Sequence, residues 1–216
     1  MNILFLNPNR NDMMTRMVLD EARRVVRPGT TLRGLTAAAG PSYIGSETTL
    51  LEGGMAALEA LGTVEEQPDA IVLACFGDPG LEALRERAGC PVVCMVDASI
   101  NYARSLGYRP GIVTGGASWQ RLLPPMLRRL GIDGQVPISC LEANGDDISR
   151  SGRAPLEEIE ASILGMHREH GVTCAIIGGA ALAGVHRRLE PSARIPVLDA
   201  SAVAAAHAEA LSSVMS

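Results

Sequence analysis

Short apolar runs alternate with longer segments of helical periodicity along this chain. The runs are rich in Val, Ile and Leu without polar alternation, which is typical of strands buried in a parallel sheet. The expected strands are residues 2–7, 70–75, 91–95, 111–114, 174–178 and 195–198. The helical patterns between them include residues 12–26, 118–130 and 156–170. The chain is therefore predicted to be an α/β protein with mostly parallel sheets flanked by helices.

Two segments carry signals against regular helix. The adjacent prolines Pro124 and Pro125 fall inside the helical pattern of residues 118–130, so a kink or break is expected there. Residues 144–155 are rich in Gly, Asp and Pro and are predicted to form a loop.

The chain also repeats itself weakly. Residues 69–75 align with 173–179, residues 90–93 with 195–198, and residues 97–99 with 199–201, at offsets of 102 to 105. The opening strand has its counterpart near residues 111–114. Four matches in one order indicate a duplication. We expect one unit, 1–216, of two pseudosymmetric lobes: residues 1–96 with 200–216, and residues 97–199. A ligand cleft would lie between them, at the carboxyl ends of the strands.

Composition narrows the class of protein. The chain has 216 residues, 47% of them hydrophobic, and a net charge of −5. It has no basic run to bind nucleic acid and no apolar stretch long enough to span a membrane. All 19 basic residues are arginine, which excludes chemistry that needs a lysine amine, such as a pyridoxal-phosphate Schiff base.

Five cysteines without a CxxC pair, and no secretory signal, indicate reduced thiols and a cytoplasmic location. Cys75 is the cysteine with the strongest signal for chemistry, since it ends a buried strand and precedes a Phe-Gly-Asp-Pro-Gly turn. Asp78 is expected to cap a helix that has Pro79 at its first position. A helix N-terminus beside the thiol would lower the pKa of Cys75 and make it a usable base near neutral pH. The alternative is a cysteine that merely packs in the core.

Other strand ends supply candidate binding groups. Gly179 occupies the position that the repeat relates to Cys75, in a turn of small residues with accessible backbone N–H groups. Asn9 follows the first strand, where it can be a helix cap or a ligand-binding group. The turn at residues 40–43 is interpreted as a flap or a plain turn. The candidate binding residues are Asn9, Phe76, Gly77, Thr114, Gly115, Gly179, Ala180 and Ala181.

No metal or cofactor site is predicted. His167 and His170 are three residues apart on a helix, but no third ligand accompanies them. His186 is expected at the surface. No GxGxxG follows the first strand, so a dinucleotide is disfavoured.

These features resemble a known family. The resemblance rests on Asn-Pro-Asn at 7–9, Met-Thr at 14–15, Gly-Pro at 40–41 and, most specifically, Ala-Cys-Phe-Gly-Asp-Pro-Gly at 74–80. Leu-Gly at 106–107 and Ile-Pro-Val-Leu-Asp at 195–199 also fit. Over nearly its whole length the chain resembles the aspartate/glutamate/hydantoin racemase superfamily, in its hydantoin/allantoin racemase-like branch. The resemblance implies two lobes around a cleft, no cofactor, a small-molecule substrate and a homo-oligomer.

The resemblance also implies a mechanism. Racemases of this family place two cysteines on opposite faces of the substrate carbon, so that one removes the α-proton and the other returns it. Cys75 would be the first. The second belongs in a Gly-Cys-Ala-Gly-Met-like turn, which here reads Gly-Gly-Ala-Ala-Leu at 178–182, so Gly179 replaces it. Backbone donors at both strand ends would hold a small carboxylate or a hydantoin-like ureide.

This departure leaves three functions open. The chain can be a racemase or epimerase whose second acid is His186, Asp78 or a water molecule. It can be a single-thiol isomerase or a cofactor-free decarboxylase similar to arylmalonate decarboxylase, or a protein that binds a small ligand without turnover. The first is preferred.

Overall fold

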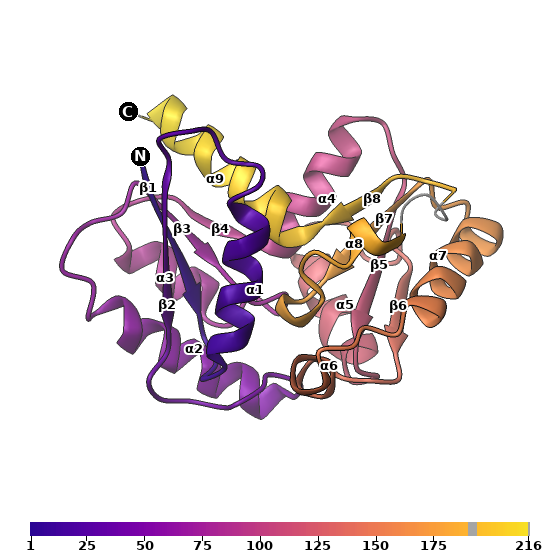
Figure 1. Cartoon of the computed structure of the whole chain (residues 1–216), viewed down its shortest axis with the longest axis horizontal. Coiled ribbons are helices and arrows are strands. Elements are labelled where there is room, and N and C mark those ends of the chain that lie inside the picture. Colours follow the sequence, from indigo (N-terminus) through magenta and orange to yellow (C-terminus); the bar gives the residue numbers. More distant parts are fainter. Residues whose placement is uncertain (190–193, 216) are drawn as a thin grey trace.

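Two four-stranded parallel sheets with flanking helices form the frame of the protein (Figure 1). The computed structural model describes residues 1–189 and 194–215. The first sheet has the order β2-β1-β3-β4 and the second β6-β5-β7-β8. The strands are β1 (Asn2–Asn7), β2 (Thr31–Thr36), β3 (Ala70–Leu73), β4 (Val92–Cys94), β5 (Pro110–Gly115), β6 (Ile138–Leu141), β7 (Cys174–Gly178) and β8 (Val197–Asp199). The identical order confirms the prediction of two related α/β lobes.

Strand alternation explains how the first sheet is buried on both faces. Ile3, Phe5 and Val72 point into a core shared with residues of the second sheet, whereas Leu4 and Leu6 point to the opposite face. That outer face packs on α2 and α3 through Leu84 and several alanines. Because both faces are apolar, these strands read as continuous hydrophobic runs rather than as alternating ones.

The helices connect the parallel strands. They are α1 (Asp12–Ala22), α2 (Glu47–Leu61), α3 (Leu81–Arg87), α4 (Met95–Ser105), α5 (Trp119–Arg129), α6 (Gly145–Ser151), α7 (Leu156–His170), α8 (His186–Leu189) and α9 (Ala200–Met215), with a short 3₁₀ turn, η1 (Ala180–Leu182). Among the described residues, none of the helices combines the length and the apolar character needed to cross a membrane.

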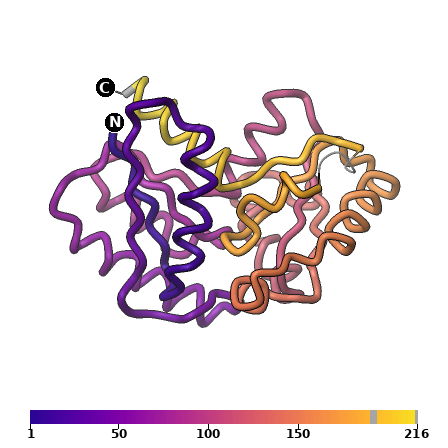
Figure 2. Tube along the Cα trace, in the orientation of Figure 1, coloured from indigo at the N-terminus to yellow at the C-terminus, as the bar shows by residue number. Residues whose placement is uncertain are grey.

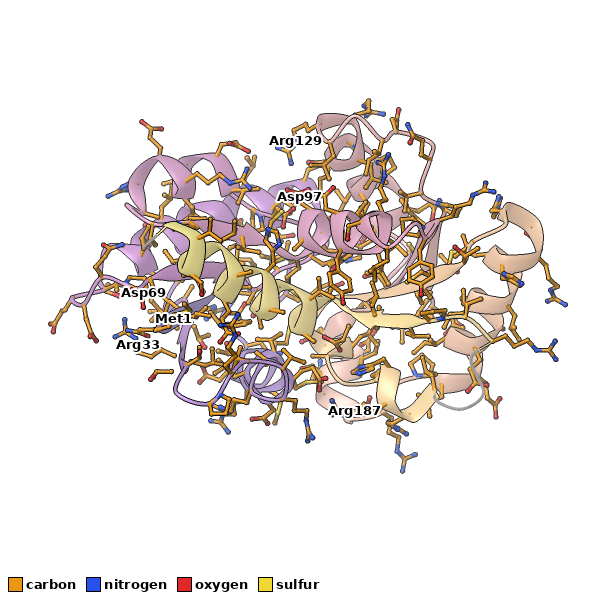
Figure 3. All side chains as sticks on the ribbon, turned by 90° about the horizontal axis from the view of Figure 1, so that it is seen from above. Met1, Arg33, Asp69, Asp97, Arg129 and Arg187 are labelled. Atoms are coloured by element: carbon orange, nitrogen blue, oxygen red, sulfur yellow. The ribbon has the colours of Figure 1, made fainter. Side chains whose placement is uncertain are left out.

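Two helices cross from one sheet to the other. Helix α4 follows β4 of the first sheet and packs on β5 and β7 of the second. Helix α9 follows β8 of the second sheet, returns to pack on β1, β3 and β4 of the first, and lies along α4 and α1 (Figures 1 and 3). The trace in Figure 2 accordingly brings the two chain ends together beside the first sheet. The repeated segments fall at the starts of these two helices: residues 97–99 lie in the first turns of α4, and residues 199–201 span the end of β8 and the start of α9.

Two local expectations differ from the structure. Helix α5 runs through Pro124 and Pro125 without the break that was one of the two outcomes expected there. The carbonyls that lose a partner to these prolines belong to Gln120 and Arg121, both exposed, and water can satisfy them. The predicted loop at 144–155 contains α6, which Asn144 caps by accepting hydrogen bonds from the backbone N–H groups of Asp146 (2.8 Å) and Asp147 (3.0 Å).

Candidate active site

A pocket lies between the carboxyl ends of the central strands of the two sheets. The cavity has a volume of about 40 Å³, well below the roughly 300–1,000 Å³ of typical ligand pockets, so its walls lie close together in this structure. Backbone and side chains from both lobes form its wall. The described lining residues are Asn9, Met14, Tyr43, Ile44, Ala74, Cys75, Phe76, Thr114, Gly115, Trp119, Gly145, Gly178, Gly179, Ala180, Ala181 and Leu182.

The ends of β3 and β7 meet at this pocket. Phe76, next to Cys75, packs its ring on Gly178: a Cβ atom added to Gly178 would lie 2.4 Å from the ring. Only glycine therefore lets the two strand ends approach so closely. Cys75 and Gly179 both line the pocket, so the structure brings together the two positions that the repeat relates.

Tyr43 bridges the two lobes across the pocket. It lies in the loop between β2 and α2, and its hydroxyl donates to the carbonyl of Gly115 (3.4 Å) and accepts from Trp119 Nε1 (3.2 Å). A Cβ atom on Gly145 would lie 2.8 Å from the Tyr43 ring. The loop at 40–43 is therefore part of the pocket wall. In the sequence, the one indication that Tyr43 belongs to the pocket was its position in a Gly-Pro turn. Nothing in the sequence indicated that Trp119 or Gly145 would line the pocket.

An asparagine network after β1 presents one amide to the pocket. Asn11, rather than Asn9, caps α1, with its side-chain oxygen accepting from Met13 N and Met14 N. Asn9 Oδ1 accepts from Asn7 Nδ2 (3.1 Å) and Asn11 N (2.8 Å). Asn9 Nδ2 contacts Met14 Sδ at 3.7 Å, a weak acceptor. The Asn9 amide is thus fixed in orientation, and its N–H group can serve a ligand carbonyl.

The Gly179 side of the pocket is open. Gly179 has φ +111°, and an added Cβ atom would have one neighbour within 4 Å, Thr114 Oγ1 at 3.6 Å. The next residues, Ala180 and Ala181, begin η1, and the first N–H groups of a helical turn have no acceptor within that turn. Thr114 and these backbone groups therefore supply polar groups to the Gly179 side of the pocket.

The pKa of Cys75 contradicts the expectation of an activated thiolate. Burial raises the pKa of this thiol to about 12, the nearby Asp78 carboxylate adds to the rise, and the backbone N–H of Gly77 opposes it. Helix α3 begins at Leu81, two residues later than expected, and has no side-chain cap. With this raised pKa, Cys75 is a protonated thiol at neutral pH.

Asp78 is not the predicted helix cap. Gly80 is the N-cap residue, and Asp78 adopts φ +44°, the one positive φ among the described residues other than glycine. Its side chain is buried and Oδ1 has no hydrogen-bond partner. Burial raises the pKa of Asp78 to about 7, while a hydrogen bond with Cys94 lowers it.

Replacing Asp78 by asparagine is expected to stabilise the protein at pH 8 but not at pH 5. A carboxyl whose pKa is raised in the folded state stabilises that state below its unfolded pKa, near 4, and loses this contribution as the pH rises to about 7. The linkage corresponds to a few kcal/mol, on the order of 1.4 kcal/mol per pKa unit. Urea unfolding at both pH values measures it.

The control for this experiment is Glu82→Gln, which neutralises an exposed carboxylate. Asparagine also tolerates positive φ, so Asp78→Asn keeps the backbone conformation. If the difference in unfolding free energy between the wild type and Asp78→Asn is the same at pH 8 as at pH 5, the raised pKa of Asp78 is contradicted.

Most, but not all, of the predicted binding residues line the pocket. Asn9, Phe76, Thr114, Gly115, Gly179, Ala180 and Ala181 line the pocket. Gly77 does not line it; it packs beneath Trp119, and its N–H points toward the Cys75 sulfur. His186 and Asp78, the two candidate second acids, are also outside the lining. His186 is partly buried, with its side chain 18% exposed, and lies between two buried carboxylates.

The fold and the pocket define a class of protein: a two-lobed α/β protein with a single thiol at a small ligand pocket between equivalent strand ends. The sequence matches the Asp/Glu/Hydantoin racemase family over residues 3–208, and the chain belongs to that family.

Individual relatives agree with this placement. The chain is 29% identical to a hydantoin racemase of Paenarthrobacter aurescens, over 98% of this chain and 91% of the relative. An allantoin racemase structure from Pseudomonas fluorescens superposes with a TM-score of 0.94 at 24% identity, covering 100% of this chain and 92% of the other. A liganded arylmalonate decarboxylase, in which one glycine is replaced by cysteine and one cysteine by serine, gives a TM-score of 0.67 at 17% identity, covering 98% and 92%.

Proposed function

We propose that this protein transfers a proton at the acidic α-carbon of a small, uncharged ureide of the hydantoin type, with Cys75 as the proton carrier and no cofactor. The observation that carries this proposal is the chemistry of the pocket wall. None of the described lining residues carries a charged side chain. A free carboxylate would lose its hydration there without gaining a counter-ion, whereas a cyclic ureide brings paired carbonyl and N–H groups and no charge.

The lining groups suit the electron movement of this reaction. As the α C–H bond breaks, its proton goes to the Cys75 sulfur and its electron pair moves to the adjacent carbonyl oxygen. Asn9 Nδ2 and the backbone N–H groups at the start of η1 are donors that can stabilise that oxygen. The reaction needs the thiolate of Cys75, so binding or a higher pH must supply it.

The opposite face of the substrate has no second thiol. With Gly179 at the related position and neither His186 nor Asp78 in the pocket lining, we propose that a water molecule beside Thr114 Oγ1 delivers a solvent proton to that face. The hydroxide formed then takes up the proton held by Cys75, which restores the thiolate and water. This arrangement gives racemisation or epimerisation with exchange of the α-hydrogen for solvent hydrogen.

A single-thiol decarboxylase is the second candidate function. The protonated state of Cys75 favours it, because a thiol of high pKa is suited to deliver a proton to one face of an enediolate. The fold likeness to arylmalonate decarboxylase is compatible with that role. The uncharged wall disfavours it, since the substrate would be a dianion.

Proton NMR in D₂O tests the proposal. The panel contains 5-substituted hydantoins, allantoin, aspartate, glutamate and an arylmalonate. We expect the α-proton signal of a hydantoin or of allantoin to disappear at least tenfold faster with the protein than without it, and the amino-acid signals to remain. A deuterated monoacid from the malonate would favour the decarboxylase. If no compound reacts but one of them binds saturably, the result would contradict an enzymatic function and support a ligand-binding protein.

A further inference from the structure

A charged cluster lies outside the pocket lining, where the chain continues from η1 into α8. His186 of α8 sits between two carboxylates: its Nε2 is 3.7 Å from Glu21 Oε1 on α1, and its Nδ1 is 3.5 Å from Asp199 Oδ2 at the end of β8. The side chains of Glu21 and Asp199 are 4% and 1% exposed. The cluster thus joins the first lobe to the second.

Further contacts fix the segment that leads from the pocket into the cluster. Arg187 pairs with Glu21, and the Gly184 N–H donates to Asp199 Oδ2 at 2.6 Å. Gly184 has φ +80°, and an added Cβ atom would lie 2.8 Å from Arg187 Nη2 and 3.2 Å from Glu21 Oε2. A side chain at position 184 would therefore collide with the Arg187–Glu21 pair. The backbone conformation between η1 and α8 is therefore set by its contacts with Glu21, Arg187 and Asp199.

The geometry favours a charge-paired cluster over a metal site. One ligand atom from each of Glu21, His186 and Asp199 can be chosen within 4.8 Å of the others. However, the imidazole presents a different nitrogen to each carboxylate, whereas a histidine ligand binds a metal through one nitrogen. Arg187, with Arg24 at 3.8 Å from Glu21, already supplies positive charge.

We propose that Glu21 and His186 are positioning residues of the active site. They hold the turn at 179–185 against α1 and thereby fix the backbone N–H groups of Ala180 and Ala181 relative to Cys75. Helix α1 carries both Met14, in the pocket wall, and Glu21, in the cluster, and η1 packs on this helix. This inference rests on the proposed function only in assuming that the Ala180 and Ala181 N–H groups bind the substrate. That the cluster holds the turn is independent of it.

The first test measures the turn without using turnover. Four amides in it are hydrogen-bonded: Leu182, Ala183 and Val185 to backbone carbonyls, and Gly184 to Asp199. In Glu21→Gln and His186→Gln we expect at least tenfold faster hydrogen–deuterium exchange at these amides, because contacts of the cluster that close the turn are lost. Strands β1 and β3 should keep their wild-type exchange rates.

Glu209→Gln is the matched control. Glu209 on α9 is similarly buried, with its side chain 7% exposed, pairs with Arg27 at 3.5 Å and accepts from Arg27 N at 3.0 Å, but it lies outside the cluster. We expect this variant to leave the turn unchanged. Equal acceleration in all three variants, or none in Glu21→Gln and His186→Gln, would overturn the proposal. So would faster exchange of the wild-type turn after EDTA, which would make the cluster a metal site.

The second test reads the effect on the reaction. We expect kcat for α-proton exchange to fall about tenfold in Glu21→Gln and His186→Gln at a temperature where both are fully folded, and not in Glu209→Gln. Unchanged kcat in variants with a loosened turn would reject the positioning role and leave the proposed function standing. A wild-type protein without any turnover would reject the proposed function, and the exchange experiment would still decide whether the cluster holds the turn.

Discussion

Replacing Cys75 by alanine is expected to reduce α-proton exchange by at least a thousandfold. A positioned acid–base group contributes about 10²–10⁴-fold to proton transfer, and Cys75 is the one thiol in the described pocket wall. Exchange by the wild-type protein should rise about tenfold per pH unit from pH 7 to pH 10, because burial raises the pKa of Cys75 to about 12 and the thiolate is a small, growing fraction.

Cys140→Ala serves as the control, since it removes a partly buried thiol from β6, away from the pocket. Solvent exchange measured by NMR, with circular dichroism to verify folding, compares the two variants. Full exchange by a folded Cys75→Ala protein would refute every catalytic function proposed for this chain. A rate independent of pH would refute the thiolate as the base.

Introducing cysteine at Gly179 is expected to raise racemisation at least tenfold while lowering the melting temperature. The added Cβ atom meets Thr114 Oγ1 at 3.6 Å, so there is space for a thiol on the strand end across from Cys75. The backbone φ of +111° is strained for any residue with a side chain, at about 1–3 kcal/mol. For a chain of this length, that cost lowers the melting temperature by about 2–4 °C per kcal/mol.

Gly179→Ala separates the two effects, since it carries the same backbone strain without the thiol. It should lose stability and gain no activity. Optical rotation of a resolved hydantoin follows racemisation, and calorimetry follows stability. Equal racemisation by the alanine and cysteine variants would show that the thiol at this position does not act on the substrate.

The buried strands and their repeat could be predicted because both are visible in short stretches of sequence. Residues 2–7 and 174–178 were found with their observed bounds, since they are apolar on both faces. The strands that were missed, β2 and β6, lie at sheet edges and are partly exposed, so their polar and glycine residues hid the pattern. Edge strands make fewer demands on side chains than central ones.

The site was predicted in part for the same reason. Strand ends could be found from the sequence, which placed Cys75, Asn9 and Thr114 in the pocket. Tyr43 and Trp119 were missed because their role depends on one hydrogen bond between residues 76 positions apart. The raised pKa of Cys75 could not be predicted either, since it follows from burial between two lobes rather than from the local turn.

The crossing of α4 and α9 bears on how such a pocket could arise. Each helix leaves the sheet that it follows and covers the other, so one half alone would lack a helix and expose the apolar surface beneath it. Two separate copies could satisfy both surfaces by exchanging their terminal helices, as in a domain-swapped dimer. In such a dimer, any substitution at a strand end would appear on both sides of the pocket at once. Fusion into one chain removes that constraint, which permits a thiol at residue 75 to persist while its counterpart at residue 179 is a glycine.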